Sequence, residues 1–151
     1  MTPAPPHTAY SMEEFCNQLR RHKLKATRQR LAVHEVMLEL GHASAEDVCA
    51  RLQERGAAIT TASVYNILTQ LADVRIYGRC LSSTNKMFFD VDTAHHIHLY
   101  DRENHSFREL DDEQLTQMVK EHFKRRRFKG YSIEEIDIQL IARPTRKSKK
   151  S

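Results

Sequence analysis

The chain has 151 residues, of which 40% are hydrophobic, and its formal net charge at pH 7 is +4. No apolar run approaches the roughly 20 residues of a membrane-spanning helix, so we expect no membrane partner. The three cysteines lie far apart and form no Cys-x-x-Cys pair, which argues against a disulfide framework and indicates a reducing, cytoplasmic setting.

The positive charge is concentrated at the C-terminus. Five of the 24 basic residues lie in residues 143–151, which leaves 19 basic against 20 acidic residues in the rest of the chain. We expect residues 143–151 to be a basic disordered tail, and residues 1–10 to be a disordered lead rather than a signal peptide.

Four helices are predicted in residues 11–91. Each begins with Ser or Thr at the N-cap, where the hydroxyl can accept a backbone N–H of the first turn, and two of them end at glycine. The predicted bounds are about 11–22, Thr27 to Gly41, Ser44 to Gly56, and Thr60 or Thr61 onward.

The fourth helix has two contrasting faces. Its apolar stripe recurs at helical spacing and predicts a buried face made of Val64, Ile67, Leu68, Leu71 and Ala72. The opposite face carries hydroxyls and amides, which suit hydrogen bonds to base edges: Thr61, Ser63, Tyr65, Asn66, Thr69 and Gln70. Two short strands, about 75–82 and 86–91, follow this helix, and helices followed by a hairpin are typical of a winged helix-turn-helix.

A histidine-rich strand opens the second half. Alternation places His96 and His98 on one face, roughly 7 Å apart. Asp90 precedes them and Glu109 lies on the following segment. Two imidazoles with carboxylates suit Fe(II), Mn(II) or Zn(II), whereas a polar strand with histidines facing solvent is the alternative, and spacing alone does not decide between them.

The residues after the histidine-rich strand predict three more elements. These are a strand over 107–110, a helix over 112–125 and a half-buried strand whose side chains alternate from Glu135 to Leu140. This half is too small to bury a good core alone, so we expect a homodimer. The predicted fold class is α+β, with an N-terminal winged-helix DNA-binding domain over 11–91 and a C-terminal α/β dimerisation and metal-binding domain over 92–142.

Four segments in order resemble the signatures of the ferric uptake regulator family, over about residues 12–142: Leu24–Arg30, His42–Val48, Ala62–Leu68 and His95–His98. The resemblance implies a dimeric, metal-dependent transcription regulator rather than an enzyme. It further implies a repressor of metal-homeostasis genes that binds a palindromic, AT-rich double-stranded DNA operator.

The resemblance also implies a sensing site of five ligands, with one divalent metal per subunit: His42, Asp90, His96, His98 and Glu109. One cation would join the two halves, and Fe2+ or Mn2+ is expected there, with Zn2+ an alternative in vitro. Simple alternation puts Phe107 and Glu109 on one face, so Glu109 needs a strand end or a bulge to reach the metal.

Several departures from the family pattern keep alternatives open. The chain lacks the paired Cys-x-x-Cys motifs, so no four-cysteine structural zinc site is expected. Ile97 replaces the acid that accompanies His95 at the family's extra site, and no cysteine precedes a proline as in a haem motif. The gap from Asp90 to His96 resembles the peroxide-sensing branch, while the absent cysteine pairs and a short C-terminal strand resemble the haem-responsive iron-response branch. The alternative is therefore a peroxide- or haem-responsive regulator of oxidative-stress genes. An iron oxygenase is the third hypothesis, although five protein ligands leave little open coordination.

For DNA contact, the resemblance points to Ser63, Tyr65 and Asn66 in the major groove. Lys25 with Arg28 or Arg30 would contact phosphates or the minor groove. Many relatives have Arg at the position of Asn66, so the base preference would differ, and Tyr65 as a packed core aromatic is the alternative.

Overall fold

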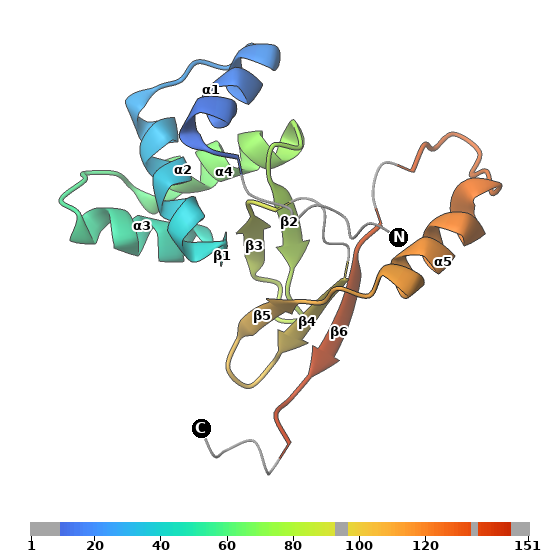
Figure 1. The fold of residues 1–151 in the computed structure, drawn as a ribbon. Coiled ribbons are helices and arrows are strands. Elements are labelled where there is room, and N and C mark those ends of the chain that lie inside the picture. Colours follow the sequence, from blue (N-terminus) through green and yellow to red (C-terminus); the bar gives the residue numbers. More distant parts are fainter. Residues whose placement is uncertain (1–9, 93–96, 134–135, 146–151) are drawn as a thin grey trace. The chain divides into compact units, whose positions relative to one another are not determined.

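The computed structural model describes residues 10–92, 97–133 and 136–145. The chain divides into two compact units, Met1–Ala94 and His95–Ser151 (Figure 1). Among the described residues, no helix combines the length and the apolar character needed to cross a bilayer.

The first unit contains the four predicted helices, each with its hydroxyl N-cap. The side chains of Ser11, Thr27, Ser44 and Thr60 all accept a backbone N–H three residues on. Ser44 also forms a capping box with Asp47, because its own N–H donates to the Asp47 carboxylate. The helices are α1 (Met12–Arg21), α2 (Arg28–Leu40), α3 (Ala45–Glu54) and α4 (Thr61–Asp73).

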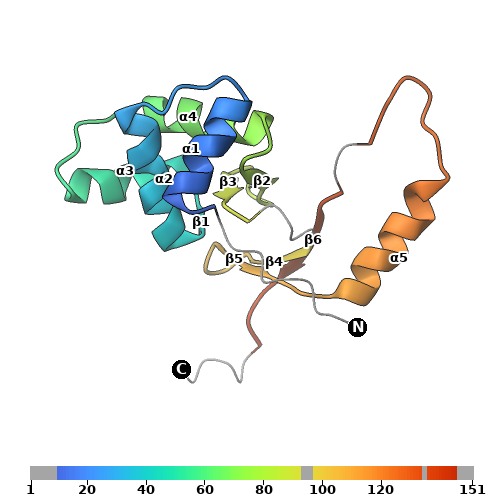
Figure 2. The same cartoon turned by 45° about the horizontal axis from the view of Figure 1, so that its top comes forward.

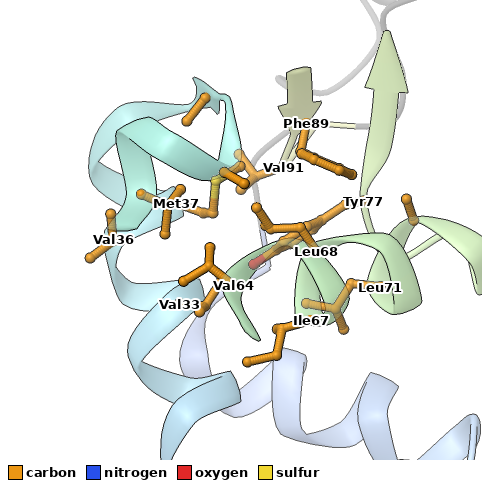
Figure 3. Close-up of a cluster of buried hydrophobic side chains, with 14 of the residues drawn as sticks. Val33, Val36, Met37, Val64, Ile67, Leu68, Leu71, Tyr77, Phe89 and Val91 are labelled. Carbon is orange, nitrogen blue, oxygen red and sulfur yellow. The ribbon is translucent and has the colours of Figure 1, made fainter. Parts of the chain in front are cut away.

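The predicted apolar stripe of α4 is buried, which confirms the period-3.6 interpretation. Val64 and Leu68 of α4 lie beside Val33 and Met37 of α2 (Figure 3). The buried ring of Phe89 belongs to the same cluster. This core fixes α4 by its apolar face, so that its polar face points outward.

His34 occupies the same core as a fully buried polar group. Its Nδ1 lies 2.7 Å from the hydroxyl of Tyr77, and its Nε2 lies 2.7 Å from the carbonyl oxygen of Tyr10. The ring stacks on Phe15 with centroids 3.9 Å apart. Burial lowers the pKa of His34, because a charged imidazole loses hydration in the core. Burial likewise raises the pKa of Tyr77.

A small antiparallel sheet follows the helices, in the order β1-β3-β2. The predicted hairpin is present but shorter than expected, and the two-residue strand β1 was not predicted. Figures 1 and 2 show the helices gathered on one side of this sheet. Gly41, with φ of +75°, ends α2 and turns the chain directly into β1. The strands are β1 (His42–Ala43), β2 (Gly78–Leu81) and β3 (Met87–Asp90).

The second unit has a three-stranded sheet in the order β5-β4-β6, with β4 antiparallel to β5 and parallel to β6. The last strand expected from Glu135 to Leu140 overlaps β6, which begins and ends later, and Glu135 itself lies outside the described residues. The pairing with β4 sets the bounds of this strand. It runs from Ile138, opposite Ile97, to Ala142, opposite Asp101. The elements are β4 (Ile97–Asp101), β5 (Ser106–Glu109), α5 (Glu113–Lys124) and β6 (Ile138–Ala142).

The helix of the second unit is poorly covered. None of the residues of α5 is buried, and in both ribbon views the helix stands away from the sheet of its own unit (Figures 1 and 2). Met118 is 61% exposed on this helix. Among the described residues of this unit, apolar side chains such as Met118 therefore remain exposed.

Candidate metal and DNA-binding residues

The first candidate ligands, His42 and Asp90, lie directly opposite one another in the first unit. The register of β1 and β3 pairs the two residues, and Nε2 of His42 lies 3.3 Å from Oδ2 of Asp90. Donor atoms that share one small cation at about 2.1 Å each lie about 3.0–3.4 Å apart. The 3.3 Å spacing fits that arrangement, and it equally fits a direct ion pair between a protonated imidazole and the carboxylate.

In the second unit, His98 lies on β4 opposite Glu109, the last residue of β5. The strand end expected for Glu109 is therefore present in the backbone. The Phe107 ring packs edge-on against the imidazole of His98, with centroids 6.1 Å apart. Nδ1 of His98 lies 3.1 Å from Oδ1 of Asp137.

Asp137 is the polar partner that the sequence interpretation missed. It precedes β6, and its closeness to His98 depends on the parallel pairing of β4 with β6, which leaves no trace in local periodicity. His96, the fifth proposed ligand, lies outside the described residues.

The polar face of α4 is open, as a DNA-reading helix requires. Tyr65 is 44% exposed and its ring meets Phe89 edge-on, so it is anchored at one edge without being a core residue. Asn66 is exposed, whereas the hydroxyl of Ser63 accepts a hydrogen bond from Thr60 at the helix cap. A hollow of about 480 Å³ adjoins this face, lined among others by Tyr65, Asn66, Asn85 and Lys86.

The three basic candidates differ in their surroundings. Lys25 and Arg28 are exposed. The guanidinium of Arg30 instead donates to the carbonyl oxygen of Lys25 at 2.8 Å and to the side chain of Gln70 on α4 at 2.7 Å. Arg30 therefore links the start of α2 to the polar face of α4.

Helices α2 to α4 followed by the β2–β3 hairpin define a winged helix-turn-helix protein with an additional α/β unit. A sequence model of the Ferric uptake regulator family matches residues 21–140, and the chain belongs to that family.

The relatives of this chain agree with that assignment. The Ferric uptake regulation protein of Neisseria gonorrhoeae is 37% identical over 93 residues, which cover 58% of this chain and 65% of that protein's length. The crystal structure of the Vibrio cholerae ferric uptake regulator is 28% identical, covers 86% of this chain and 99% of its own, and has a TM-score of 0.71. The structure of the Pseudomonas aeruginosa ferric uptake regulator with manganese is 26% identical to this chain and has a TM-score of 0.70. The match covers 86% of this chain and 97% of that protein.

Proposed function

We propose that this chain is a cytoplasmic metal-responsive repressor that binds operator DNA as a homodimer and controls metal-homeostasis genes. The observation that carries the proposal is the pairing of His42 with Asp90, two residues distant in sequence that β1 and β3 place opposite one another. An imidazole and a carboxylate are both ligands that Mn(II), Fe(II) and Zn(II) accept, and this pairing brings one of each together.

The proposed ligand set is His42, Asp90, His96, His98 and Glu109. The imidazoles supply nitrogen and the carboxylates supply oxygen, a mixture that accepts Mn(II), Fe(II) and Zn(II). The relative from Pseudomonas aeruginosa is described with manganese, which supports Mn(II) as the first ion to test. When bound, the cation supplies a coordination centre that constrains the ligand side chains from both units.

In this proposal DNA reading depends on α4. Ser63, Tyr65 and Asn66 would contact base edges, while Lys25, Arg28 and Arg30 would contact the backbone. A palindromic site is read by two copies of α4 at a fixed half-site spacing, so a cation that fixes each unit in place would raise DNA affinity.

A homodimer would cover the apolar surface of the second unit. A second copy is the occupant that we propose, because the twofold pairing of this surface would supply the two reading helices that a palindrome needs. The exposed apolar residues available for that contact are Met118, Phe128, Tyr131, Ile133, Leu140 and Ile141.

The test is a gel-shift titration on a duplex selected from a random pool in the presence of Mn(II). At constant ionic strength, the wild type should bind at least about tenfold more tightly with Mn(II) than with chelator, a coupling on the usual allosteric scale. His42→Ala should lose that difference, and His22→Ala, which removes an exposed histidine elsewhere in the first unit, should retain it. Equal binding by the wild type in both conditions would contradict the proposal.

A peroxide-responsive regulator is the second candidate, because the carboxylate facing His42 comes from Asp, as in the peroxide-sensing branch that the sequence resembles. Fe(II)-loaded protein treated with peroxide should then gain one oxygen on His42 or His96. A peptide mass spectrum with both histidines unmodified would remove this candidate.

A further inference from the structure

His98 is oriented by two side chains within its own unit. Phe107 packs edge-on against one side of the ring, and the Asp137 carboxylate lies 3.1 Å from Nδ1. The register explains the second contact. Gln139 pairs with His98 in the parallel ladder, and Asp137 lies two residues earlier, on the same side of the chain.

This contact determines which ring nitrogen carries the proton. An ionised carboxylate has only acceptor oxygens, so the Nδ1 of His98 must be the donor. A neutral imidazole protonated at Nδ1 presents its lone pair at Nε2, and a cation would therefore bind at Nε2.

We propose that Asp137 is a positioning residue for the metal site. Its carboxylate holds His98 in the Nδ1–H tautomer and directs Nε2 towards the cation, without itself being a ligand. Carboxylates that hydrogen-bond a ligating histidine in this way fix its orientation and raise its basicity. Only the affinity part of this inference rests on the metal site proposed above.

The first test uses the metal-free full-length chain. Long-range 15N–1H correlation spectra should show His98 protonated at Nδ1 in the wild type. In Asp137→Ala the Nε2–H form should appear, while Asp137→Asn, which keeps an acceptor oxygen, should retain the Nδ1–H form. Glu103→Gln removes one exposed carboxylate from the same unit and should leave His98 unchanged.

The second test is Mn(II) binding followed by calorimetry on the same proteins. Asp137→Ala should weaken binding by about 10–100-fold, the usual effect of losing an outer partner. Asp137→Asn should lose less affinity for Mn(II) than Asp137→Ala, whereas equal losses in the two variants would overturn the positioning role.

The two proposals fail in different ways. An unchanged His98 tautomer in Asp137→Ala overturns the inference even where the wild type binds Mn(II). Absence of Mn(II) binding by the wild type contradicts the proposed function, while the metal-free spectra still decide the role of Asp137.

Discussion

The guanidinium of Arg30 donates a hydrogen bond to the side-chain oxygen of Gln70, 2.7 Å away, and so joins the first turn of α2 to the outer face of α4. A second bond from Arg30 to the carbonyl oxygen of Lys25 holds the preceding loop. The sequence predicts Arg30 only as a DNA contact, whereas its two hydrogen bonds within the unit add a structural role.

Arg30→Ala should therefore affect both folding and DNA binding. The loss of its two bonds should lower the free energy of unfolding by about 1 kcal/mol, measured by urea denaturation. The exposed Arg28 is the matched control. Arg28→Ala should leave stability within about 0.5 kcal/mol but weaken DNA binding and reduce its salt dependence by about one phosphate contact. Equal stability of the two variants would contradict the structural role of Arg30.

Asn66→Ala should change base preference more than overall affinity. An Asn that bonds adenine through both its amide atoms contributes about 1–3 kcal/mol of discrimination at one base pair. Competition between the selected operator and single-base variants should show one position losing its preference. Gln29→Ala, at an exposed position of α2, should leave the preference profile unchanged. A uniform loss across all sequences would instead make Asn66 a backbone contact.

His34 should make stability depend on pH. Its pKa is lowered in the folded protein, so the unfolded chain takes up a proton first as the pH falls through the ordinary value of about 6.5. The stability that neutral His34 gives is thus present above that value and lost below it, by up to about 1.4 kcal/mol per pH unit.

Urea denaturation between about pH 5 and 8 measures this dependence. His34→Phe keeps the stack on Phe15 but has no titratable ring, so its stability should fall less steeply in acid. Parallel pH profiles for the two proteins would show that His34 does not contribute.

Met118→Glu should separate the proposed dimer. Burial of this side chain at a subunit contact would contribute about 1.5–3 kcal/mol, and a buried charge would add a penalty. Sedimentation should show the dissociation constant rising at least about tenfold. Gln114→Glu places the same charge at another exposed position of α5 and should leave the dimer intact. A monomeric wild type at micromolar concentration would contradict the assembly.

The parts of the fold that sequence predicted are local. Helix caps such as Ser44 and the buried stripe of α4 depend on residues three or four positions apart, and periodicity shows them directly. For Glu109 the sequence predicted only a place on the segment after the histidine-rich strand; its opposition to His98 comes from the register of the β4–β5 hairpin.

The features that could not be predicted from the sequence are contacts between segments far apart in the chain. Strand β1 has two residues, too few for any periodicity, yet it places His42 opposite Asp90. The contact between His98 and Asp137 needs the parallel pairing of β4 and β6, and the Arg30 contact needs α2 beside α4. In each case tertiary packing selects one partner among many equivalent polar residues.

The most direct test of the proposed metal site is Mn(II) binding followed by electron paramagnetic resonance in His42→Ala and His98→Ala, one proposed ligand from each unit. A shared site predicts one bound ion per wild-type chain. Each substitution should weaken the affinity for that same ion by at least about tenfold, and His22→Ala should bind it like the wild type. If His98→Ala binds Mn(II) like the wild type, or if each substitution removes a different ion, the two units do not share a cation and the proposed switch is wrong.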